Sequence, residues 1–147
     1  MFTNILIPTD GSALSKRSIK AGIALAKALG ARVTGYYAME ALQPYVFGDG
    51  YVIDRATMDQ LDKQAKATAE KYLGEIEKLA AAANVPYEGL ITKPGASYQG
   101  IIDAAKKKKC DAIFMASHGR GEVATLLLGS VTQKVLSHSK LPVIVYR

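Results

Sequence analysis

The sequence is poor in the residues and segments that mark several protein classes. It has one cysteine, Cys110, and two histidines among 147 residues. An internal disulfide is therefore excluded, and a metal site built from histidine and cysteine is disfavoured. No apolar run approaches the roughly 20 residues that a membrane-spanning helix needs. The beginning of the chain, MFTNILIPTDGS, lacks the long apolar segment of a signal peptide. From these absences we expect a soluble, intracellular protein.

The composition that remains is typical of a single globular domain. Hydrophobic residues make up 49% of the chain and charged residues 22%, a balance that argues against disorder. No low-complexity segment or internal repeat divides the chain, so we expect one domain spanning residues 1–147. The net charge of +6 favours anionic ligands without identifying one.

Short apolar runs alternate along the chain with segments of helical periodicity. The predicted strands are 3–9, 32–39, 87–92, 110–116 and 142–146. The predicted helices are 12–29 with Ser12 as N-cap and Gly30 as stop, 54–84, one capped by Ser97, and 129–138. The apolar stripe of the longest helix is predicted to comprise Met58, Leu61, Ala65, Ala69, Tyr72, Ile76 and Leu79. This order predicts an α/β fold, a doubly wound, Rossmann-like, five-stranded parallel sheet with helices on both faces.

Ligands of such folds bind beyond the carboxyl ends of the strands. Residues 8–10, 37–40 and 115–119 end three of the predicted strands, so we expect them to meet at one edge of the sheet. The aromatic residues Tyr45, Phe47 and Tyr51 follow the second strand. They either cover a bound base or pack against the sheet edge or a partner.

The segment Ala116-Ser117-His118-Gly119 is followed, after nine residues, by Gly129-Ser130 at the start of a predicted helix. A helix start offers backbone N–H groups and the positive end of the helix dipole, so it favours an anion. We therefore hypothesise a phosphate site here, with residues 120–128 as a lid. Ser130 and Gln133 also match a capping box, which on its own would only satisfy the helix donors.

Several polar residues admit two interpretations. Asp10 either faces the hydroxyl or amino groups of a ribose or base, or it serves as a turn residue before Ser12. For His118 we favour a structural or phosphate-neighbour role, since no order of acid, histidine and nucleophile accompanies it. His138 and the run 106–109 lie near helix ends, where cations complement the dipole. No nucleic-acid-binding signature accompanies that run, so nucleic acid is not an expected partner.

The segments ILIPTDGS, ASHGRG, LLGSVTQKVL and KLPVIVYR follow one another in the chain. Together they resemble the universal stress protein (UspA-like) family over essentially the whole length. ATP-binding members of that family carry the pattern Gly-x2-Gly-x9-Gly-Ser/Thr. Gly119, Gly129 and Ser130 match its last positions, whereas Ala116 stands at the first glycine. An alanine there would cost roughly 1 kcal/mol if the position needs a positive φ, and would act only by contact if the backbone is an ordinary strand.

The resemblance implies an adenine nucleotide, ATP or AMP, as ligand. Mg²⁺ is a candidate ion on its phosphates. The implied contacts are Pro8, Thr9, Asp10, Ala38, Met115, Ala116, Gly119, Gly129, Ser130 and Val131. The adjacent candidates for nucleotide binding are Ser117, His118, Arg120 and Thr132.

The resemblance also implies a homodimer through the last strand, a cytoplasmic location and a role in stress responses. The apolar segment 142–146 independently favours pairing at a sheet edge. The leading functional hypothesis is a nucleotide-binding sensor or regulator without robust turnover, and no catalytic residue is assigned. The alternatives are a weak ATP hydrolase and a dimeric interaction module that binds no nucleotide.

Overall fold

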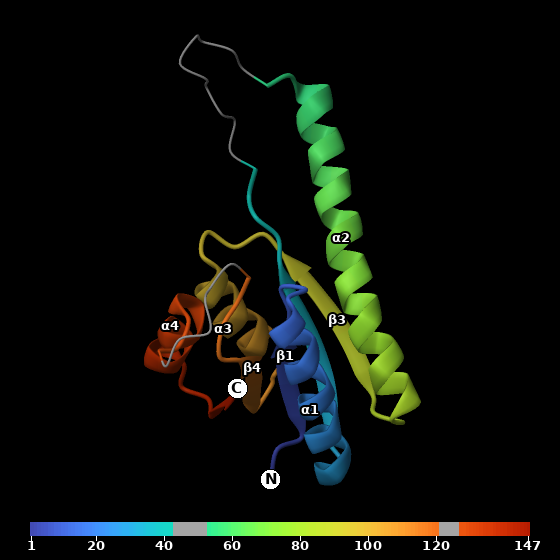
Figure 1. Ribbon diagram of the computed structural model, residues 1–147, viewed down its shortest axis with the longest axis vertical. Coiled ribbons are helices and arrows are strands. Elements are labelled where there is room, and N and C mark those ends of the chain that lie inside the picture. Colours follow the sequence, from blue (N-terminus) through green and yellow to red (C-terminus); the bar gives the residue numbers. More distant parts are fainter. Residues whose placement is uncertain (43–52, 121–126) are drawn as a thin grey trace.

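The computed structural model describes residues 1–42, 53–120 and 127–147. The strands within them are β1 (Asn4–Pro8), β2 (Arg32–Ala38), β3 (Tyr87–Thr92), β4 (Ala112–Ala116) and β5 (Val143–Tyr146). The helices are α1 (Ala13–Leu29), α2 (Arg55–Ala82), α3 (Ser97–Lys107) and α4 (Ser130–His138). The strands form one parallel sheet in the order β3-β2-β1-β4-β5, which confirms the predicted fold (Figure 1).

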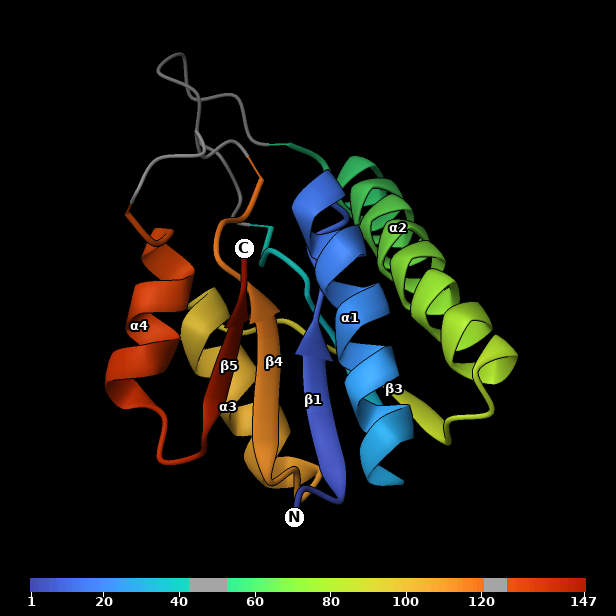
Figure 2. The ribbon, with the colours of Figure 1, turned by 60° about the horizontal axis from the view of Figure 1, so that its bottom comes forward.

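Helices cover both faces of the sheet, α1 and α2 on one and α3 and α4 on the other (Figure 2). Alternate residues of β1 supply the two cores because successive strand side chains point to opposite faces. Ile5 and Ile7 pack with α1 and α2, whereas Leu6 packs with α3 and α4, and all three are fully buried. Because helices cover both faces of the sheet, the side chains on both faces of a central strand are buried, which explains why such a strand is apolar throughout.

The long helix α2 only partly follows its predicted stripe. Its buried residues are Ala69, Leu73, Ile76 and Ala80, whereas Leu61 is 38% exposed. A helix of 28 residues is about 42 Å long, roughly twice the length of β3 beneath it. The amino-terminal half of α2 therefore extends past the sheet (Figure 1), and only the other half has a core to join.

The helix ends agree with the sequence at α1 and differ at α3. Ser12 is the N-cap of α1 and accepts a hydrogen bond from Ser15 N, and Gly30 ends this helix with a φ of 65°. The prediction that Ser97 caps α3 is wrong, because the N-cap is Ala96 and Ser97 is the first helical residue.

The interpretation of the basic run agrees with the structure, and Cys110 is part of the core. Lys106 and Lys107 lie in the last turn of α3, and Lys108 Nζ pairs with Glu88 Oε2 at 2.7 Å. Cys110 is buried, and burial raises the pKa of its thiol, which keeps it protonated and unreactive. The aromatic residues Tyr45, Phe47 and Tyr51 and most of the predicted lid lie outside the described residues.

Candidate functional site

A cleft of about 580 Å³ opens at the carboxyl edge of the sheet, where the sequence predicts the ligand. This edge lies between strands that lead to helices on opposite faces, the usual ligand position in a doubly wound fold. The predicted site residues that line it are Pro8, Thr9, Asp10, Ala38, Met115, Ala116, His118, Gly119, Arg120, Ser130, Val131 and Thr132. Two predicted residues, Ser117 and Gly129, do not line it, and Ser117 is buried behind it.

The helices add cleft residues that the sequence analysis missed or placed elsewhere. Thr68 of α2 and Ile101 of α3 line the cleft, as does Tyr36 of β2. Ala65 belongs to the predicted core stripe of α2 but lies on the cleft wall instead. Ala65 and Thr68 are three residues apart on α2, so the sequence places them on one face of that helix. The way in which the helix packs on the sheet decides which of its faces meets the cleft.

Three contacts attach the start of α4 to the end of β4. Gly129 N donates to Ser117 O at 2.8 Å, and Thr132 Oγ1 donates to Ala116 O at 3.0 Å. The ring of His118 adds a third contact, from Nε2 to the Leu127 carbonyl. Because a carbonyl can only accept, this Nε2 carries the proton, and Nδ1 then accepts from Ser117 Oγ at 2.9 Å. These contacts give His118 a structural role at the edge of the cleft, one of the two roles that the sequence favours.

The predicted capping box at the start of α4 is not formed. Gly129 is the N-cap, so Ser130 lies within the helix as its first residue. The side-chain amide of Gln133 donates to Leu128 O at 2.8 Å instead of turning back to the cap residue's N–H. Ser130, Val131 and Thr132 are the first residues of α4 and line the cleft, so the first helical turn lies at the cleft wall.

The backbone at Ala116 settles how an alanine is accommodated there. Ala116 is the last residue of β4 and pairs with Tyr146 of β5. Among the described residues other than glycine, only Asn84 and Lys109 have a positive φ. The alanine therefore introduces no left-handed strain, and its methyl group acts only by contact.

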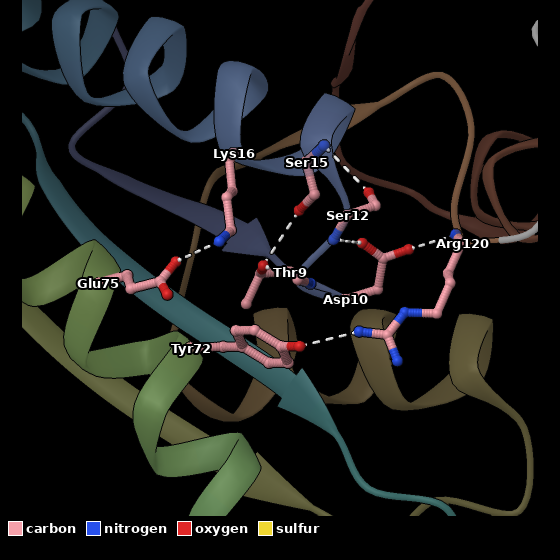
Figure 3. Close-up of polar contacts among 9 residues, drawn as sticks. Thr9, Asp10, Ser12, Ser15, Lys16, Tyr72, Glu75 and Arg120 are labelled. Atoms are coloured by element: carbon pink, nitrogen blue, oxygen red, sulfur yellow. Dashed lines mark hydrogen bonds and ion pairs between the residues drawn. The ribbon is translucent and has the colours of Figure 1, made fainter.

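Asp10 occupies the turn between β1 and α1, and both of its carboxylate oxygens accept backbone hydrogen bonds (Figure 3). Oδ1 accepts from Ser12 N at 2.9 Å, and Oδ2 accepts from Arg120 N at 2.7 Å. The first bond is the turn role considered from the sequence. The second joins residues that are 110 positions apart.

Tyrosines form part of the wall on the β2 side. Burial raises the pKa of Tyr36 and of Tyr37, so both hydroxyls stay protonated at neutral pH. Tyr36 Oη lies 2.7 Å from Thr92 Oγ1, a contact that holds the ring against β3. Among the described residues no group of three or more histidine, cysteine or acidic side chains is arranged to hold a metal ion.

The universal stress protein family model matches residues 1–147 of this sequence. The chain belongs to the universal stress protein family. A universal stress protein of Thermus aquaticus is 33% identical over 147 residues, which cover the whole of both chains. No described helix is both long and apolar enough to cross a membrane.

Solved structures of other universal stress proteins share the fold. MJ0577 of Methanocaldococcus jannaschii superposes with a TM-score of 0.81 at 24% identity, covering 99% of this chain and 95% of that one. A universal stress protein in complex with cAMP has a TM-score of 0.70 at 23% identity, with 99% and 97% covered. One from Archaeoglobus fulgidus in complex with dAMP has a TM-score of 0.63 at 19% identity, with 99% and 98% covered.

Proposed function

We propose that this universal stress protein binds an adenine nucleotide, ATP or AMP, in the cleft and acts as a stress-response sensor or regulator. The observation that carries the proposal is the start of α4, which is tied to β4 and opens into the cleft. A fixed helix start places N–H donors and the positive dipole end where phosphates would lie. The two relatives solved with cAMP and dAMP support an adenine nucleotide as the ligand class.

The shape of the cleft suits a ligand with an apolar base and an anionic tail. Its volume of about 580 Å³ is in the range of small-molecule sites. Ala38 and Ile101 line the wall and offer apolar contacts for a base. Gly119, Ser130 and Val131 would surround the phosphates, which would hold any bound Mg²⁺.

Catalysis forms no part of the proposal. His118 on the cleft wall has both ring nitrogens in structural contacts with Ser117 and Leu127. Asp10 likewise accepts two backbone N–H groups. Neither group is arranged as a general base with a nucleophile, so we infer a binding and signalling role in the cytoplasm.

The test is to denature purified protein and to identify any released nucleotide by mass spectrometry. Calorimetry with ATP and with AMP, each with and without Mg²⁺, then measures the affinities. We expect at least one adenine nucleotide to bind below millimolar concentration. If none binds at millimolar concentration, the proposed ligand is wrong, and the result favours the alternative of a dimeric interaction module that binds no nucleotide.

We also propose a homodimer that pairs through residues 142–146. β5 is an edge of the sheet in the strand order, and each of its residues is only half-buried. An apolar edge strand offers backbone donors and acceptors to a second copy. Sedimentation equilibrium at micromolar concentration is expected to give twice the chain mass. Sedimentation at the mass of one chain would contradict the dimer.

A further inference from the structure

Asp10 and Arg120 form a bridge between two turns that border the cleft. Asp10 follows β1 and Arg120 lies four residues past the end of β4, and the two face each other across the 2.7 Å bond from Arg120 N to Asp10 Oδ2 (Figure 3). A backbone N–H that donates to a carboxylate forms a charge-assisted hydrogen bond, which is stronger than a neutral one. This bond fixes the path of the backbone just after Gly119, on the cleft wall.

Gly119 provides the space for this carboxylate. A Cβ atom built at Gly119 would lie 3.0 Å from Asp10 Oδ2, closer than most real contacts of this kind. A side chain at position 119 would therefore push the carboxylate away from Arg120 N. The glycine of the phosphate motif thus serves the bridge to Asp10, in addition to any contact with a ligand.

The side chain of Arg120 reinforces the same bridge. Arg120 Nη2 donates to Tyr72 Oη of α2 at 2.9 Å. The ring of Tyr72 in turn covers Gly11, where a Cβ would lie only 2.2 Å from Tyr72 Cζ. Gly11 also has a φ of 78°, a conformation that favours glycine. Arg120 thus joins Asp10 to Tyr72 (Figure 3), and Tyr72 packs on Gly11, the neighbour of Asp10 in the chain.

We propose that Asp10 is a positioning residue: its carboxylate holds the Gly119-Arg120 backbone in the shape that binds the nucleotide. It acts through this backbone and not by reading the ribose hydroxyls. The inference rests on the proposed function, since it assigns a role in that same cleft. A backbone held in place before the ligand arrives binds more tightly, because less conformational freedom is lost on binding.

The distinguishing experiment compares two ligands on the Asp10→Asn variant. Asparagine keeps the size and the ability to hydrogen-bond a hydroxyl, but its NH₂ group would face Arg120 N–H if its oxygen stays on Ser12 N. Calorimetry is performed with ATP and with 2′,3′-dideoxy-ATP, which lacks both ribose hydroxyls. We expect the variant to bind both ligands about tenfold more weakly than the wild type, by the same factor. A loss confined to ATP, or no loss at all, would overturn the positioning role.

Asp111→Asn is the matched control. Asp111 also accepts backbone N–H groups, from Thr3 at 2.8 Å and Asn4 at 3.1 Å, but it precedes β4 at the opposite edge of the sheet. Its substitution should lower the free energy of unfolding without changing the affinity for either ligand. Equal losses of affinity in both variants would show a general effect of destabilisation and count against the proposal.

A second readout needs no nucleotide. Hydrogen exchange of the Arg120 amide in the ligand-free protein is expected to be at least tenfold faster in Asp10→Asn and unchanged in Asp111→Asn. If wild-type protein binds no nucleotide, the proposed function fails, and this exchange rate alone then decides whether the bridge exists. If nucleotide binds but exchange at Arg120 is the same in Asp10→Asn, the positioning role is wrong while the proposed function stands.

Discussion

Replacing Gly129 with leucine is expected to weaken ATP binding at least about 100-fold, or roughly 2.7 kcal/mol, while the domain stays folded. Gly129 has φ −61° and ψ 154°, a conformation open to any residue, so the substitution adds no backbone strain. It adds a bulky side chain at the start of α4, next to Ser130 and Val131 on the cleft wall. There it would take the space of the phosphates and screen the helix donors from them.

Calorimetry with ATP measures the effect, and urea unfolding checks the fold. Gly74→Leu is the matched control, because a Cβ at Gly74 meets no atom within 4 Å and the residue lies on α2 away from the cleft lining. Gly129→Ala should give an intermediate loss. Wild-type affinity in Gly129→Leu would contradict the proposed phosphate site at this helix start.

Gly100→Ala is expected to lower the free energy of unfolding by about 1–3 kcal/mol. A Cβ at Gly100 would lie 2.3 Å from Tyr36 Oη and 2.6 Å from Pro94 Cγ, so α3 or its neighbours must move. Tyr36 cannot yield easily, since its side chain is 1% exposed and its hydroxyl is bonded to Thr92. The overlap outweighs the higher helix propensity of alanine, which favours it by about 1 kcal/mol.

Urea unfolding of Gly100→Ala and Gly74→Ala separates the effect of steric overlap from the effect of helix propensity. Gly74 lies inside α2 with open space around its Cβ, so alanine there should stabilise the protein by about 0.5–1 kcal/mol. If alanine lowers the free energy of unfolding at Gly100 and raises it at Gly74, the close approach of Tyr36 explains why position 100 needs a glycine. A Gly100→Ala variant as stable as the wild type would contradict the packing described here.

The location of the site could be predicted because it depends on local pattern and on topology. The alternation of strands and helices shows in the periodicity of apolar residues, and right-handed crossovers then place the strand ends at one edge. Pro8, Ala38 and Met115 therefore reach the cleft wall as expected. The start of α4 also follows from local signals, although the cap itself is Gly129 and not Ser130.

The sequence by itself determined the fold class, the edge that carries the cleft and most of the residues of β1, β2, β4 and α4 that line it, because each depends on neighbours in the chain. Only the tertiary structure decided which face of α2 meets the cleft, since Ala65 and Thr68 share a helix with core residues such as Ile76. It also decided the partner of Asp10. A hydrogen bond between residues 110 positions apart depends on how two turns pack against each other, and no local sequence pattern predicts such a contact.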